Sequence, residues 1–150
     1  MKTMTDEAKL KTIEDIYRES RQEFLEVPEI TAEQLQLRLA KDDLVLVDVR
    51  QAHEREVSML PGAISSQEFE QNRSVYQGKT VVTYCKVGHR SGLYAKTLCA
   101  DGCDVLNLKG AILSWTHVGG ELIDASGPTK RVHINNPKAN LVAEGYEPVW

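Results

Sequence analysis

The segment 84–91, YCKVGHRS, contains the residues best suited to chemistry. Cys85 directly follows an apolar run and precedes a glycine and two cationic residues, Lys86 and Arg90. A cysteine between a strand and a helix lies where loop N–H groups and the positive end of the helix dipole converge, and nearby cations further favour the thiolate. Gly88 permits the positive φ that turns successive N–H groups inward. The pattern therefore predicts a loop that stabilises a thiolate, a persulfide or a bound oxyanion.

The length of this loop indicates which ligand it fits best. Four residues separate Cys85 from Arg90, whereas the anion-binding loop of cysteine phosphatases has five. The shorter loop leaves a tighter pocket, which matches a single sulfur atom on Cys85 better than a phosphate group. A phosphatase or an arsenate reductase, which would bind a phosphate or arsenate group in this loop, is therefore less favoured than an enzyme that carries a single sulfur atom on Cys85.

Strands and helices alternate around this loop at a spacing typical of a mostly parallel sheet covered by helices. The apolar runs 44–49 and 80–85 predict buried strands, and helix 91–100 is expected to pack inward through Leu93, Tyr94 and Leu98. Further elements are expected at 29–31, 32–39, 52–57, 105–108 and 111–115. Thr31 and Gln34 have the spacing of a helix capping box, and Trp115 is expected to be a core anchor below the loop. Since sites form at the carboxyl ends of parallel strands, Asp48 and Cys85 should lie on one rim.

Both ends of the chain extend beyond this alternating core. Apolar residues recur at helical spacing over 5–25 and predict an amphipathic helix that docks on the domain or binds a partner. The turn-rich composition from residue 124 onward predicts an extended tail that lies over the domain, with a possible strand at 132–134. Tyr146 and Trp150 are candidates for packing on the domain or against a second copy.

Composition narrows the class of protein. The 150 residues, 41% of them hydrophobic, suffice for one globular domain, and the net charge of −4 with scattered basic residues argues against nucleic-acid or membrane partners. No apolar run approaches the length of a membrane span or a signal peptide, which predicts a cytoplasmic protein. Three cysteines are an odd, sparse set that fits a reducing compartment.

Several motifs together resemble one known family. The segments LVLVDVR, LPGAI, VVTYCKVGHRSGLYA, VLNLKGAILSW and GGEL follow one another in the order of a single-domain rhodanese, a sulfurtransferase. The resemblance implies a three-layer α/β/α fold with a five-stranded, mostly parallel sheet. It implies a rhodanese-like domain over 29–122, an N-terminal helical extension over 1–28 and a C-terminal tail packed on the domain over 123–150.

The resemblance also implies a mechanism that needs no metal or other cofactor. Cys85 would take the sulfane sulfur of thiosulfate, a polysulfide or a persulfide, and pass it to a thiophilic acceptor such as cyanide or a thiol. The partners would be a small-molecule donor and acceptor, with a protein acceptor as another possibility; the oligomeric state is left open. The implied active-site loop consists of Lys86, Val87, Gly88, His89, Arg90 and Ser91.

Individual residues carry further expectations. Asp48 and Arg50 resemble the Asp-x-Arg pair that braces the loop, whereas Lys86 and Arg90 would bind the donor sulfonate or shape the loop. Where the family often has Gly-His, this chain has the segment 58–60, Ser-Met-Leu, interpreted as a change of surface contacts. His89 would add charge near the sulfur or relay a proton.

Less specific interpretations compete with these. Cys99 and Cys103 are expected to be core residues, with a resolving disulfide to Cys85 as the minor alternative. A zinc site built from the cysteines and His89 is disfavoured, because the intervening helix would hold the ligands apart. His53, His117 and His133 are expected to be isolated, on the surface or in satisfied packing. A non-enzymatic binding or regulatory module is the alternative to an enzyme.

Overall fold

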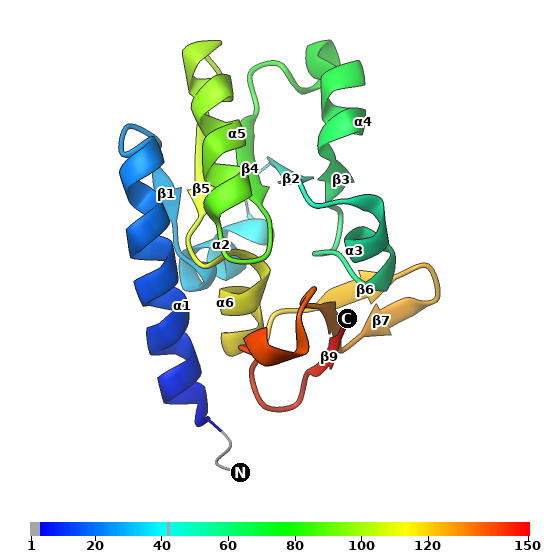
Figure 1. Ribbon diagram of the computed structural model, residues 1–150. Coiled ribbons are helices and arrows are strands. Elements are labelled where there is room, and N and C mark those ends of the chain that lie inside the picture. Colours follow the sequence, from blue (N-terminus) through cyan, green and yellow to red (C-terminus); the bar gives the residue numbers. More distant parts are fainter. Residues whose placement is uncertain (1–3, 42) are drawn as a thin grey trace.

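A computed structural model describes residues 4–41 and 43–150, so residues 1–3 of the expected N-terminal extension lie outside the described part. Its centre is a five-stranded sheet in the order β1-β5-β4-β2-β3, and every neighbouring pair is parallel (Figure 1). The strands are β1 Glu29–Ile30, β2 Leu44–Asp48, β3 Ile64–Ser65, β4 Thr80–Tyr84 and β5 Val105–Leu108. The predicted three-layer α/β fold is confirmed.

Helices cover both faces of the sheet, and short 3-10 helices (η) lie between α1 and β1, between α4 and β4, and between β8 and β9. The α-helices are α1 Asp6–Ser20, α2 Ala32–Leu39, α3 Ala52–Val57, α4 Ser66–Gln71, α5 His89–Ala100 and α6 Ala111–His117. The 3-10 helices are η1 Arg21–Phe24, η2 Arg73–Tyr76 and η3 Pro137–Ala139. Thr31 and Gln34 form the expected capping box at the start of α2. Helix α5 begins two residues before the expected position.

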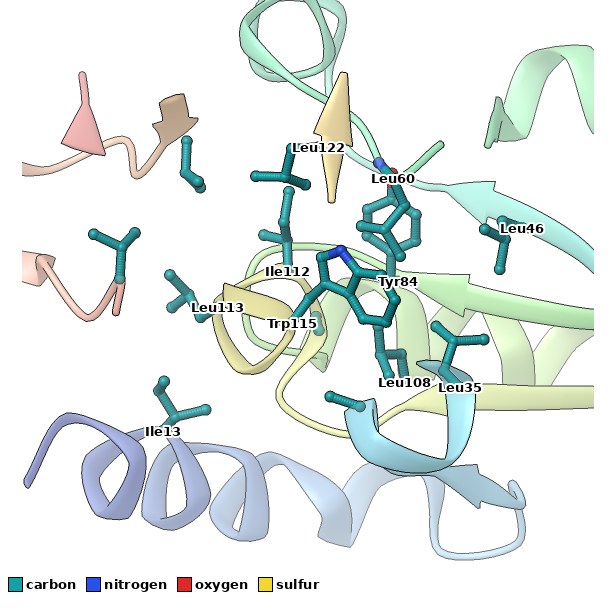
Figure 2. Packing of buried hydrophobic residues seen from close by; sticks show 14 of the residues in the cluster. Ile13, Leu35, Leu46, Leu60, Tyr84, Leu108, Ile112, Leu113, Trp115 and Leu122 are labelled. Carbon is teal, nitrogen blue, oxygen red and sulfur yellow. The ribbon is translucent and has the colours of Figure 1, made fainter. Parts of the chain in front are cut away.

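Alternation along the strands divides the core into two clusters. In β2, Val45 and Val47 face a cluster with residues of η1, α4 and α5, called the α5 cluster below. Leu46 faces a cluster with residues of α2 and α6, called the α6 cluster below. Trp115 of α6 lies in this second cluster beside Tyr84 and Leu60, as Figure 2 shows. Trp115 is thus the core anchor that was predicted.

The α5 prediction needs one correction. Leu98 is buried as expected, but Leu93 is among the exposed large apolar residues, with 38% of its surface accessible. The face turned to the sheet contains Ser91, Ala95 and Leu98, which are buried and spaced three to four residues apart. Leu93 lies on the opposite face of the helix.

The C-terminal segment contains more structure than its composition predicted. A hairpin joins β6 Leu122–Asp124 to β7 Gly127–Thr129, and β8 Arg131–His133 pairs in parallel with β9 Glu147–Val149. Val132, Ile134 and Val142 are buried in the α6 cluster. In Figure 1 the segment, coloured orange to red, lies beside α6 at the end of the sheet where α5 begins. It therefore covers the rim that the sequence predicted to hold the site.

Within residues 4–41 and 43–150, no helix combines the length and the apolar character that crossing a membrane requires.

Candidate active site

The site lies at the carboxyl ends of β2 and β4. Asp48 is in register with Tyr84, and the Val49 N–H donates to the Tyr84 carbonyl at 3.0 Å. Cys85 directly follows the last residue of β4, so Asp48 and Cys85 share one rim of the sheet. The parallel pairing predicted from the two apolar runs is what brings them together.

Hydrogen-bond donors of the loop converge on the sulfur of Cys85, which is only 2% exposed. The Gly88 N–H lies 3.2 Å from Sγ, and the N–H and hydroxyl of Ser91 lie 3.5 and 3.4 Å from it. Gly88 has a φ of +128°, a conformation that favours glycine. The segment 85–91, called the Cys85 loop below, thus surrounds the sulfur with donors, which suit an anionic sulfur.

A buried polar network that the sequence interpretation missed holds this loop from below. The Asn107 side chain donates to the Gly88 carbonyl at 3.1 Å and accepts from the Thr83 hydroxyl at 3.0 Å. Thr83 also lies 3.3 Å from the Ser91 carbonyl. Both Thr83 and Asn107 are fully buried. The signal was present, because Asn107 is a polar residue in an otherwise apolar buried strand, and such residues need a partner.

The N-terminal helical segment packs directly on the loop. A Cβ added at Gly88 would lie 2.6 Å from the Tyr17 ring, and one at Gly92 would lie 2.3 Å from the Phe24 ring. Tyr17 and Phe24 are buried in the α5 cluster. Burial, together with the nearby Glu29 carboxylate, raises the pKa of Tyr17. The amphipathic helix therefore uses its apolar stripe within this chain.

Asp48 and Arg50 form a fully buried ion pair. Arg50 Nη2 lies 2.7 Å from Asp48 Oδ2, and Nε lies 3.0 Å from Oδ1. The same Nη2 donates to the Ser58 carbonyl at 2.7 Å, and the guanidinium lies over the Tyr84 ring. Burial opposes the charge of Arg50, but its bonds to Asp48 outweigh burial and raise its pKa. The pair therefore ties the end of β2 to segment 58–60, where the chain departs from the family pattern.

Both cations of the Cys85 loop are bound by protein groups. Lys86 Nζ donates to the Ile134 carbonyl at 3.0 Å, and Arg90 binds both carboxylate oxygens of Glu54 at 2.8 and 3.0 Å. Burial and the charge of Arg90 lower the pKa of Lys86. Of the two roles expected for these cations, the contacts favour shaping the loop over binding a donor.

Glu54 is a second residue that the sequence interpretation missed. It is 1% exposed and also accepts from the Asn135 side chain and the Gln51 N–H, both at 3.1 Å. Burial opposes its charge, but the hydrogen bonds from Arg90, Asn135 and Gln51 lower its pKa to about 2. No sequence signal identified Glu54, because its partners Arg90 and Asn135 lie 36 and 81 positions away.

The histidines differ from their predicted arrangement. His89 is half exposed and pairs with Glu23 at 2.8 Å, so its imidazole is held by η1 rather than by the sulfur. His53 and His133 were expected to be isolated, yet their rings lie 4.9 Å apart in an edge-on arrangement. They come together because α3 and β8, which are far apart in sequence, pack against each other.

Cys99 and Cys103 lie at the other end of α5, and all three cysteines are free. Ten helical residues at about 1.5 Å each place Cys99 about 15 Å from the loop, so a disulfide with Cys85 would require unfolding. Both residues are partly buried against the α5 cluster rather than fully in the core. Among the described residues, no group of three or more His, Cys, Asp or Glu side chains is arranged to hold a metal ion.

Comparison with known proteins assigns the family. A model of the rhodanese-like domain matches residues 31–117, and the chain therefore belongs to the rhodanese-like domain family. A protein named sulfurtransferase from Allochromatium vinosum is 33% identical over 106 residues, which cover 67% of this chain and 99% of the relative.

Solved structures agree with this assignment at the level of the fold. A thiosulfate sulfurtransferase from Pseudomonas aeruginosa is 24% identical with a TM-score of 0.61, over 75% of this chain and 23% of that longer chain. A rhodanese-related protein from Thermoplasma volcanium is 21% identical with a TM-score of 0.56, over 64% of this chain and 97% of its own.

Proposed function

We propose that this protein is a sulfurtransferase that carries a sulfane sulfur as a persulfide on Cys85. The observation that carries the proposal is the convergence of the Gly88 and Ser91 donors on Sγ. Family membership and the sulfurtransferase relative support the same chemistry. We further propose a cytoplasmic location, in keeping with the three free thiols.

The proposed reaction has two displacement steps. The Cys85 thiolate attacks the sulfane sulfur of thiosulfate, an S–S bond forms at Cys85, and sulfite leaves with the electron pair of the broken bond. A nucleophilic acceptor, cyanide or a thiolate, then attacks the outer sulfur, and Cys85 leaves as the thiolate. The second step returns the loop to its starting state, so turnover needs no external oxidant or reductant.

Each residue of the site has a role in this scheme. The donors of Gly88 and Ser91 stabilise negative charge on the sulfur in both steps, and one such donor typically contributes a few kcal/mol at other oxyanion sites. The Asp48–Arg50 ion pair and the Glu54–Arg90 ion pair hold the loop in place. Lys86, whose partner is a neutral carbonyl, supplies positive charge near the sulfur and so favours attraction of anionic donors, whereas the charge of Arg90 is balanced by Glu54.

We also propose that residues 29–122 form the sulfur-transfer domain. Segment 1–28 would then buttress the loop through Tyr17 and Phe24, and segment 123–150 would cover the rim. The buried positions of Tyr17, Phe24, Val132 and Ile134 support this division.

Turnover assays test the proposal. Thiosulfate and cyanide should give thiocyanate with the parent protein, and Cys85→Ala should abolish this turnover. Phosphate-ester or arsenate turnover that exceeds thiosulfate turnover would favour the phosphatase or reductase interpretation instead. Absence of turnover with thiosulfate, polysulfide and glutathione persulfide would favour a non-enzymatic module.

A further inference from the structure

The rim of the Cys85 site is covered by a segment that lies outside the family match. The match ends at residue 117, whereas β8 and the turn after it, residues 131–136, reach back to α3 and the Cys85 loop. Val132 and Ile134 are fully buried in the α6 cluster and anchor this turn. Residues 133–135, which include the buried Ile134, are called the clasp.

Two adjacent residues of the clasp connect to both loop cations. The Ile134 carbonyl accepts from Lys86 Nζ at 3.0 Å. The Asn135 side chain donates at 3.1 Å to Glu54 Oε2, the same oxygen that accepts from Arg90 Nη2 at 3.0 Å. The position of the clasp is therefore coupled to the positions of Lys86 and Arg90.

The third residue of the clasp adds a neutral ring beside these charges. The Asn135 N–H lies 3.2 Å from His133 Nδ1, which makes this nitrogen the acceptor. Burial and the neighbouring His53, together with the charges of Arg50 and Lys86, lower the pKa of His133, although Glu54 opposes them. Asn135 itself has a φ of +67°, a left-handed conformation that asparagine and glycine tolerate best.

We propose that the clasp positions Lys86 and Arg90 and restricts access to Cys85 to small inorganic or low-molecular-weight sulfur donors and acceptors. Its residues are positioning residues, since they act through Glu54, Lys86 and Arg90. Cys85 is only 2% exposed, and the clasp binds Lys86 beside it and Glu54, the partner of Arg90, so a folded protein acceptor would have to displace these contacts. The substrate class rests on the proposed function, whereas the restriction of access is a property of the fold.

Two substitutions at Asn135 alter the clasp while keeping its backbone conformation. Asn135→Gly removes the side-chain donor, and Asn135→Asp places a second carboxylate against Glu54 and so repels it. The matched control is Asn136→Ser, at the neighbouring asparagine, whose side chain accepts from the Lys138 N–H within the tail. Serine retains an acceptor at that position.

The readout is the rate of alkylation of Cys85 by a bulky maleimide relative to the rate with iodoacetamide. Peptide mass spectrometry separates Cys85 from Cys99 and Cys103, which report general loosening of the fold. We expect Asn135→Gly to raise the ratio at Cys85 about fivefold, the factor that the loss of one hydrogen bond corresponds to. We expect a larger rise for Asn135→Asp, because repulsion of Glu54 adds to the lost hydrogen bond, and an unchanged ratio for Asn136→Ser and at the other two cysteines.

Kinetics with thiosulfate give the second readout. We expect Asn135→Asp to raise KM several-fold with a smaller change in kcat, because the loop cations lose their fixed positions while the sulfur keeps its donors. An unchanged ratio and unchanged KM in both Asn135 variants would overturn the clasp. Failure of the parent protein to take up sulfur would overturn the proposed function instead, and the alkylation ratio would still decide on the clasp.

Discussion

Glu54 on α3 binds the guanidinium of Arg90 on the Cys85 loop through both carboxylate oxygens, at 2.8 and 3.0 Å. The carboxylate is buried, whereas the Arg90 side chain is 42% exposed. This contact joins the connection after β2 to the loop after β4, so both sides of the site depend on the charge of one glutamate.

The low pKa of Glu54 predicts an acid-sensitive contribution to stability. Its pKa falls from 4.5 in the unfolded chain to about 2 in the fold, so the contribution is complete above about pH 4.5 and is lost as the pH falls toward 2. Allowing for the exposure of Arg90, we expect about 2 kcal/mol. Urea unfolding between pH 7 and 2 measures it.

Glu54→Gln should unfold more readily than the parent at pH 7 and lose less stability on acidification. The exposed Glu68→Gln variant serves as the control and should follow the parent. A parallel pH dependence of parent and Glu54→Gln would contradict the assigned role of Glu54.

Contact between Tyr17 and Gly88 predicts a specific intolerance at position 88. Gly88→Ala adds a methyl group 2.6 Å from the Tyr17 ring at a φ of +128°, so both overlap and backbone strain destabilise it. We expect a loss of about 2 to 4 kcal/mol in the free energy of unfolding. Gly102→Ala is the matched control, since φ is +85° and no atom lies within 4 Å of the added Cβ.

For Gly102→Ala we expect a loss of about 1 kcal/mol, from backbone strain alone. Chemical denaturation of the two variants gives the comparison. Equal losses at the two positions would show that Tyr17 does not press on the loop.

The network beneath the loop predicts different effects for two threonines of β4. Thr83→Val removes the hydroxyl that donates to Asn107 and leaves the buried Asn107 Oδ1 without this partner. We expect a loss of about 1 to 3 kcal/mol in the free energy of unfolding. Thr80→Val removes an exposed hydrogen bond to Asp104 and should cost well under about 1 kcal/mol. Thr83→Val should also speed alkylation of Cys85, because Thr83 contacts the Ser91 carbonyl. Similar stability of the two variants would show that the network does not hold the loop.

The buried ion pair predicts a large loss when one partner is removed. Asp48→Ala leaves the guanidinium of Arg50 buried without its counter-ion, which should destabilise the fold by about 3 to 5 kcal/mol. Asp43→Ala removes an exposed partner of Lys79 and should cost at most about 1 kcal/mol. Thermal and urea unfolding of both variants test the difference, and a loss below about 1 kcal/mol for Asp48→Ala would refute it.

Much of the fold could be predicted from sequence because its signals are local. Continuous apolar runs identified β2 and β4, a capping box identified the start of α2, and the strand-loop-helix pattern placed Cys85 at the rim. The prediction for the inward face of α5 was partly wrong, because Leu93 is exposed whereas Leu98 is buried. The two residues are five positions apart, a spacing that does not share one face of a helix.

Contacts between distant segments were the part that sequence could not predict. Asn135 meets Glu54 because β8, which precedes Asn135, packs on α3, and Ile134 meets Lys86 from 48 positions away. The hairpin of β6 and β7 was missed because strands of three residues are too short to show a period. Asn107 was detectable in principle, as a polar residue in a buried strand.

Sulfur uptake by Cys85 is the central claim, and mass spectrometry after incubation with thiosulfate tests it most directly. We predict one added sulfur on the peptide that contains Cys85, retained in a Cys99→Ser/Cys103→Ser variant and absent from Cys85→Ser. An unmodified Cys85 peptide, or added sulfur confined to Cys99 or Cys103, would contradict the account.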